Sequence, residues 1–175
     1  MRRALIWAPL ALFAIVAALA MAGLFQPGDR TIRSRLVGKP LPHFALPASV
    51  PGKPGVSAAG FRAGEPRLLN VFGSWCVPCI AEAPQLGEIA AAGVPIDGLA
   101  IRDRGPDVAR FLSQHGDPFA AIGDDPESAV QLALGSAGVP ETFVIDGRGV
   151  IRHQHVGPIR DEDVPVLIAA WKDAQ

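Results

Sequence analysis

The only two cysteines of the chain, Cys76 and Cys79, lie three residues apart in the stretch GSWCVPC. Two thiols at this spacing can form a disulfide, supply ligands to a zinc or copper ion, or carry out reversible dithiol–disulfide exchange. A purely structural disulfide that closes so small a loop would stabilise the fold only slightly. A zinc site needs four ligands, and the four histidines lack the tight spacing that would supply two of them.

The surrounding sequence favours redox catalysis. The apolar stretch 67–72 predicts a buried strand before the cysteines, and a helical pattern follows them. Cys76 is therefore expected at a helix N-terminus, where N–H groups and the helix dipole stabilise a thiolate, and it should be the attacking and more exposed sulfur. Cys79, one turn later, can reach it from the same side. Pro78 is tolerated in a first helical turn, and Trp75 provides an apolar shoulder that limits access of water.

Strands and helices alternate through the rest of the chain. The apolar pattern predicts strands at 67–72, 94–102, 118–122, 141–146 and 150–156, and helices at 80–93, 106–116, 126–134 and 161–171. Pro84 should kink the first of these helices. Short strands and loops are expected between 43 and 67. This order predicts an α/β fold, in which helices cover both faces of a mixed sheet.

The N-terminus has a different composition. Every residue from 4 to 25 is apolar or is Pro or Gly, and as a helix this run would be roughly 33 Å long, enough to cross a bilayer. We expect an uncleaved membrane anchor at 1–25, a linker at 26–42 and a domain at 43–175. A small-residue cleavage site at 18–20 is the alternative. The net charge of −1, without a basic cluster, argues against nucleic acid as a partner.

The stretches LLNVFGSWCVPC and GVPETFVIDGRGVIRHQHVG resemble the thioredoxin superfamily, and the likeness covers about residues 38 to 172. More narrowly, they are similar to the membrane-anchored reductases of cytochrome c maturation, the CcmG/DsbE group, with the TlpA and ResA proteins as near relatives. The resemblance implies a thioredoxin-like fold and a single-pass protein of the bacterial inner membrane, with its catalytic domain in the periplasm. That subgroup commonly has an aromatic residue where this chain has Ala137.

The same resemblance implies the reaction and its partners. A dithiol–disulfide oxidoreductase of this kind needs no dissociable cofactor and no metal. A membrane dithiol donor of the DsbD/CcdA type would supply the electrons. Apocytochrome c or a CcmH-like thiol protein would receive them.

Further residues take their expected roles from the resemblance. Val139 and Pro140 match the cis-proline that faces the sulfurs and pairs with a bound peptide, and Gly157 would line the same groove. Asn70 stands where thioredoxins usually carry a buried Asp that takes a proton during exchange, and an amide cannot do so at neutral pH. Glu141 is the candidate replacement, because burial beside the cis-proline would raise its pKa toward neutrality.

Two other functions remain open. A general extracytoplasmic thioredoxin of the ResA/TlpA type would use the same chemistry. A copper-binding or copper-delivery protein would use Cys76, Cys79 and a histidine, although copper carriers of this superfamily typically space their cysteines C-x-x-x-C. His153 and His155 are expected to point to the same face of one strand. They could form a metal-binding pair, but a half-exposed strand face is the preferred interpretation.

Overall fold

The computed structural model describes residues 2–24, 34–136 and 138–175, and within the first range it describes the side chains of 7–23. The chain divides into two compact units, Met1–Thr31 and Ile32–Gln175. The first contains helix α1 (Arg2–Leu24). Within the described residues no helix is both long and apolar enough to cross a membrane, so the structure does not confirm the predicted anchor. Much of the expected linker, up to residue 33, lies outside the described residues.

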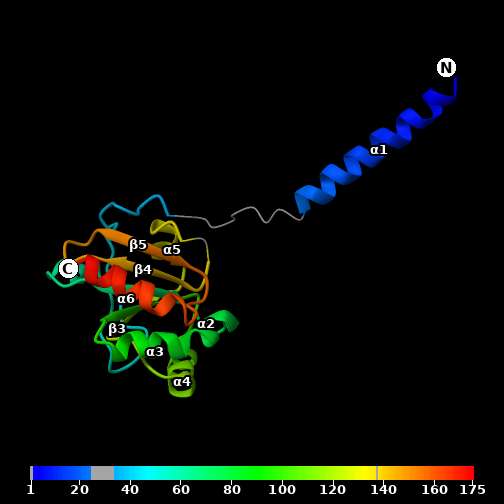
Figure 1. Cartoon of the computed structure of the whole chain (residues 1–175). Helices are drawn as coiled ribbons and strands as arrows, with labels where there is room; N and C mark the ends of the chain where they lie inside the picture. The colour runs from blue at the N-terminus through cyan, green and yellow to red at the C-terminus, as the bar shows by residue number, and fades with distance from the viewer. Residues whose placement is uncertain (1, 25–33, 137) are drawn as a thin grey trace. The chain divides into compact units, whose positions relative to one another are not determined.

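A five-stranded mixed sheet forms the centre of the second unit (Figure 1). Its strands are β1 (Arg67–Phe72), β2 (Ile96–Ile101), β3 (Ala121–Asp125), β4 (Glu141–Ile145) and β5 (Ile151–Val156). Their spatial order is β3-β2-β1-β4-β5; β1, β2 and β3 run parallel, and β4 is antiparallel to both β1 and β5. The predicted mixed sheet is confirmed, and the strand that leads into the cysteines lies at its centre.

Both faces of the sheet are covered. The helices are α2 (Val77–Ala81), α3 (Ala83–Ala91), α4 (Gly105–His115), α5 (Ala129–Ala133) and α6 (Asp163–Asp173), with a 3₁₀ turn, η1 (Gly60–Arg62). One hydrophobic cluster joins a sheet face to α3, α4 and α6, and it includes both cysteines. The other face packs against α5 and the segment 36–61. In that segment isolated bridges replace the short strands expected from the sequence.

Strand β3 begins three residues later than predicted and includes two aspartates. Asp125 is buried, and its carboxylate accepts hydrogen bonds from the first three N–H groups of α5, at 2.9–3.0 Å. Because the Asp125 carboxylate pairs with these otherwise unpaired N–H groups, it can be buried at the end of a strand and cap the next helix. The apolar pattern of the sequence does not carry this information.

Pro84 separates two helices rather than kinking one. Helix α2 ends at Ala81 and α3 begins at Ala83, with Glu82 between them. A proline inside a continuous helix would remove one hydrogen bond and collide with the preceding turn, whereas in the first turn of α3 its missing N–H costs little. Cys76 therefore precedes a helix of only five residues, so the dipole expected to stabilise its thiolate is that of a short turn.

A glycine in β2 allows two aromatic rings to stack against the sheet. A Cβ atom at Gly98 would lie 2.9 Å from the Phe72 ring and 3.1 Å from the Phe119 ring, whose centroids are 4.9 Å apart. Gly98→Ala should lower the free energy of unfolding by about 1–3 kcal/mol, because an added methyl group forces side chains in a closed core to shift. Urea denaturation measures the change.

Gly87→Ala is the matched control for this prediction. Gly87 is exposed in α3, and a Cβ atom there would meet nothing within 4 Å. The substitution should leave stability unchanged or raise it by up to about 1 kcal/mol, because alanine is the better helix former. Equal denaturation midpoints for the two variants would show that the core adapts to the methyl group at residue 98.

Candidate active site

Cys76 and Cys79 form a disulfide bridge, with their Cα atoms 5.2 Å apart. Cys76 caps the N-terminus of α2, and the backbone N–H of Cys79 donates a hydrogen bond to its Sγ, with an N···S distance of 3.2 Å. Pro78 lies in the first turn of α2, as predicted. Cys76 is 4% exposed and Cys79 only 1%. Cys76, whose sulfur accepts an N–H that would stabilise a thiolate, is thus also the slightly more exposed residue of a buried pair, in the direction predicted.

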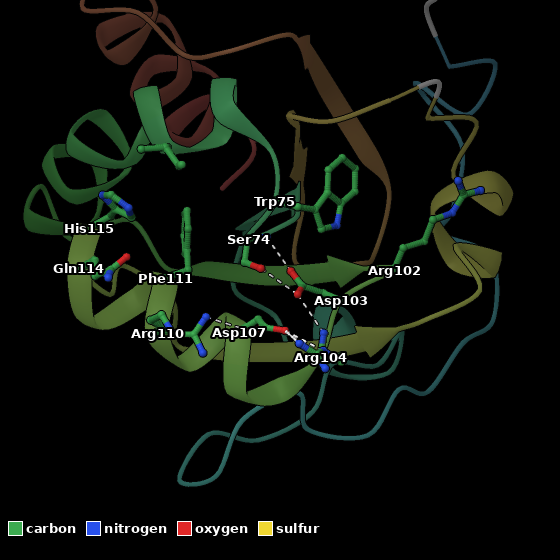
Figure 2. A pocket seen from close by; sticks show the side chains of 11 residues that line it. Ser74, Trp75, Arg102, Asp103, Arg104, Asp107, Arg110, Phe111, Gln114 and His115 are labelled. Carbon is green, nitrogen blue, oxygen red and sulfur yellow. Dashed lines mark hydrogen bonds and ion pairs between the residues drawn. The ribbon is translucent and has the colours of Figure 1, made fainter.

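The loop that precedes the cysteines is tied to the end of β2. Trp75 Nε1 donates a hydrogen bond to the Ile101 carbonyl at 3.3 Å. The backbone N–H and the hydroxyl of Ser74 donate to the carboxylate of Asp103, at 2.5 and 2.8 Å (Figure 2). A Cβ atom at Gly73 would lie only 2.7 Å from the Trp75 ring, so glycine allows the ring to fold back here. Trp75 remains 54% exposed, and it lines the hollows on both sides of its ring.

The Val139–Pro140 peptide bond is cis, as predicted. The Pro140 carbonyl accepts a hydrogen bond from the N–H of Gly157 at 3.1 Å. Val139 and Trp75 line one hollow of about 230 Å³, which lies next to the cysteine loop. The structure therefore brings the cis-proline segment and Trp75 together, whereas the place of Gly157 in the substrate groove stays a prediction. Ala137, which stands where the subgroup commonly has an aromatic residue, lies outside the described residues.

A buried glutamate that the sequence did not single out lies behind the disulfide. Glu82 is fully buried, and its carboxylate accepts hydrogen bonds from Asn70 Nδ2 and from the N–H of Ile159, both at 2.9 Å. With Cys79 and Asn70 it lines a narrow hollow whose other walls are mostly apolar. Burial raises the pKa of Glu82 from 4.5 to about 7, although both hydrogen bonds favour the ionised form. A carboxyl with this pKa can accept and return a proton near neutral pH.

Two features of the sequence could have pointed to Glu82. It follows Cys79 by three residues, so on a helix it would lie one turn further along the same side. Pro84, two residues later, marks the place where the helix must break and where a side chain can turn inward. A lone glutamate among alanines nevertheless reads as a surface residue, and only the packed structure shows that it is covered.

Glu141, the proton acceptor expected from the sequence, points to the other face of the sheet. Its neighbour Thr142 belongs to the face of the cysteines, because Thr142 Oγ1 accepts a hydrogen bond from Asn70 Nδ2 at 3.0 Å. Successive side chains of a strand point to opposite faces, so Glu141 lies on the far face, where it accepts a hydrogen bond from Gln154 Nε2. The role of Glu141 stays a prediction, but Glu82 is the carboxylate that shares a hollow with a cysteine.

The histidine pair of β5 forms a half-exposed surface, as preferred from the sequence. His153 and His155 are both half-buried. His155 Nε2 lies 3.4 Å from the Pro158 carbonyl and 3.8 Å from the Asp163 carboxylate. Among the described residues, no three His, Cys, Asp or Glu side chains are grouped so that they could hold a metal ion.

Comparison with known proteins agrees with this geometry. The model of the Redoxin family matches residues 36–170. The chain is 38% identical over 155 residues to a thiol:disulfide interchange protein DsbE homolog of Paracoccus denitrificans, covering 89% of this chain and 86% of that one. It is 39% identical over 174 residues to the thiol:disulfide interchange protein DsbE of Pseudomonas fluorescens, covering 99% and 92%.

A solved structure described as a DsbE thiol:disulfide interchange protein from Chlorobium tepidum superposes with a TM-score of 0.68 at 26% identity, over 82% of this chain and 99% of that one. The similarities in sequence and in fold therefore agree with the geometry of the site, in which a cysteine pair opens a helix and the Val139–Pro140 bond is cis. The chain belongs to the Redoxin family, within the thioredoxin superfamily, and is a thiol:disulfide oxidoreductase similar to DsbE.

Proposed function

We propose that the protein reduces disulfides of partner proteins, with Cys76 as the attacking and Cys79 as the resolving sulfur. The observation that carries the proposal is the asymmetry of the pair: the Cys76 sulfur accepts an N–H and Cys76 is the slightly more exposed residue, while Cys79 shares a hollow with Glu82. The Cys76 thiolate attacks one partner sulfur, and the other leaves as a thiolate and takes up a proton. Cys79 loses its proton and attacks the Cys76 sulfur, which releases the second partner thiolate. Two electrons pass to the partner, and the Cys76–Cys79 disulfide remains.

Glu82 is the group that accepts the proton of Cys79 in this mechanism. Its carboxyl shares an otherwise apolar hollow with Cys79, and its pKa of about 7 allows it to be a base at neutral pH. Asn70 holds this carboxyl in place. The Oδ1 atom of Asn70 is buried without a hydrogen-bond partner among the described residues. A rotation of the amide by 180° would turn this oxygen toward a protonated Glu82, so Asn70 can serve both states of the acid.

We place this reaction in cytochrome c maturation. Apocytochrome c or a CcmH-like thiol protein would be the acceptor, and a membrane reductase of the DsbD/CcdA type would be the donor. The support is the similarity to proteins named DsbE, together with the sequence motifs. A general ResA/TlpA-type thioredoxin is the alternative with the same chemistry. Copper delivery is less well supported, because no histidine joins Cys76 and Cys79 in a possible metal-binding group of the described residues.

The location is a separate part of the proposal. We place the domain in the bacterial periplasm, attached to the inner membrane by residues 1–25, on the apolar sequence of that segment and on the resemblance. Cell fractionation with a carbonate wash tests the attachment, and protease digestion of spheroplasts tests the side of the membrane. Recovery of the full-length chain in the soluble fraction would contradict the attachment.

The order of the two cysteines can be tested by trapping. Cys79→Ser should accumulate mixed disulfides with partners in cells, because no second thiol can release them, and Cys76→Ser should accumulate none. Non-reducing electrophoresis followed by mass spectrometry identifies what is captured. Capture by the Cys76 variant alone would reverse the roles. A broad set of unrelated proteins, without apocytochrome c or a CcmH-like protein, would support the general thioredoxin.

The two candidate carboxylates can be separated kinetically. Stopped-flow exchange with a disulfide peptide from pH 5 to 9 measures the resolving step. In the wild type its rate should rise with pH through about 7, because Glu82 accepts a proton only when it is ionised. Glu82→Gln should slow this step by about 10–100-fold and remove the inflection, while Glu141→Gln should preserve both. The reverse pattern would assign the proton to Glu141.

The raised pKa of Glu82 also predicts a pH-dependent stability. The carboxyl titrates near 4.5 when unfolded and near 7 when folded, so the folded state binds the proton more tightly. This contribution is complete below pH 4.5 and is lost as the pH rises through 7. From pH 4 to 8 the oxidised wild type should lose about 3 kcal/mol of unfolding free energy relative to Glu82→Gln, at about 1.4 kcal/mol per pKa unit. Urea denaturation measures the difference, and a constant difference would contradict the titration.

A further inference from the structure

A groove with several arginines lies beside the cysteine loop, and the exchange chemistry does not account for it. It has a volume of about 440 Å³ and is lined by Ser74 and Trp75 on one side, and by residues 102–104 and α4 on the other (Figure 2). We propose that this groove binds a segment of the partner protein that carries carboxylate side chains next to its disulfide. The proposal rests on the proposed disulfide exchange and names the class of substrate.

The groove adjoins the loop that carries Cys76. Ser74 and Trp75, which form one wall, immediately precede Cys76, and Ile80 of α2 lines the groove as well. A partner whose disulfide reaches Cys76 can therefore place part of its own chain at this opening. An extended chain advances about 3.3–3.6 Å per residue, so a side chain two or three residues from the partner's cysteine can enter the groove.

The groove has more arginines than aspartates, and its ion pairs involve only some of them. Three arginines, Arg102, Arg104 and Arg110, and two aspartates, Asp103 and Asp107, line it. The oxygens of Asp103 accept hydrogen bonds from uncharged donors: the N–H and hydroxyl of the preceding loop and the backbone N–H of Arg104. Asp107 alone pairs with Arg104 and Arg110, at 2.7 and 3.0 Å. The Nε atom of Arg102 donates to an uncharged serine hydroxyl. The lining therefore carries more positive than negative charge.

The positive groups are also the outer ones. The side chains of Arg104 and Arg110 are 82% and 64% exposed, whereas that of Asp107 is 21% exposed. Each guanidinium has five N–H donors, of which the shared carboxylate uses only some. The unused donors face the solvent, where they can bind an incoming carboxylate in a bidentate manner.

The backbone at the edge of the groove adopts an unfavourable conformation. Arg102 has a φ of +47° although it is not glycine, and Ser128, whose hydroxyl accepts its Nε–H, has a φ of +57°. The N–H of Arg102 also donates to the Asp125 carbonyl at 3.3 Å. Such conformations are retained where surrounding contacts hold them, often at functional sites. The next two residues are Asp103, which accepts the hydrogen bonds of the cysteine loop, and Arg104, which lines the groove.

Apolar side chains beside the groove indicate the rest of the partner segment. Trp75 is 54% exposed and Val77 is 73% exposed, and they flank Cys76 in the sequence. A segment that crosses Cys76 would place apolar residues against these two side chains and acidic residues against Arg104 and Arg110. A basic segment would face like charges and is disfavoured.

The test uses three disulfide-bonded peptides that differ only at the second and third residues from one cysteine, with Glu–Glu, Gln–Gln or Lys–Lys there. Stopped-flow kinetics give the second-order rate constant for attack by the reduced protein. At low salt the Glu peptide should react about 3–10-fold faster than the Gln peptide, and the Lys peptide more slowly than both. The differences should shrink at 0.5 M salt, because exposed charges are screened.

Substitutions of the arginines test whether the preference for the Glu peptide comes from the groove. Arg104→Gln/Arg110→Gln should abolish it, measured as the ratio of the Glu to the Gln rate constant, and Arg104→Glu/Arg110→Glu should reverse it in favour of the Lys peptide. The matched control, Arg148→Gln/Lys172→Gln, removes two positive charges at exposed positions that do not line the groove, and it should keep the preference.

Each outcome bears on one proposal. Equal rate constants for the three peptides in the wild type would overturn the acidic-segment proposal and leave disulfide exchange intact. A preference that survives in Arg104→Gln/Arg110→Gln, or that disappears in the control, would also overturn it, because the selectivity would not come from this groove. Failure of the wild type to reduce any of the peptides would instead contradict the proposed reductase function.

Discussion

The burial of one carboxyl beside the disulfide is the constraint on which the rest of the site depends. Removing a carboxylate from water is unfavourable unless hydrogen bonds compensate for the lost hydration. Asn70 from the central strand and the N–H of Ile159 supply two such bonds to Glu82, and Thr142 of β4 holds the amide of Asn70. The compensation is incomplete, because burial still raises the pKa to about 7. In the proposed mechanism this incompleteness matters, because it would make Glu82 a base at the pH at which Cys79 must lose its proton.

The placement of this carboxyl follows from local rules of chain geometry. Pro84 cannot continue the helix that starts after Cys76, so the chain breaks at Glu82 and resumes as α3. The break turns a residue of the active-site segment into the core, while strand alternation along β1 directs Asn70 to the same face. Because the chain breaks at Glu82, Cys76 lies at the start of a short helix and lacks the dipole of a long one. The hydrogen bond from the N–H of Cys79 to the sulfur of Cys76 remains.

Features carried by local sequence were predictable, and features that depend on packing were not. Apolar runs predicted the order of strands and helices, and the motif around Cys76 together with the resemblance predicted the cis bond before Pro140. The shifted start of β3 depends on Asp125, which caps a helix and so can be buried in a strand. The same limit explains the preference for Glu141 over Glu82. Closeness to a motif suggested Glu141. Both carboxyls are buried, and the face of the sheet to which each belongs, which favours Glu82, appears only when the sheet is assembled.

In the proposed mechanism, proton transfer and recognition use different polar side chains, although Phe111 of α4 lines both places. Cys79 and Glu82 lie in an apolar hollow between the central strand and helices α2 and α3, where water is scarce and a shifted pKa can be maintained. The walls that meet a partner, Trp75 and the arginine groove, are held by the end of β2 through Ile101 and Asp103. Arg104 and Arg110 are exposed, and neither is a hydrogen-bond partner of Glu82, whose carboxylate bonds to Asn70 and Ile159. Selectivity for a partner can therefore vary on this fold without loss of the exchange chemistry.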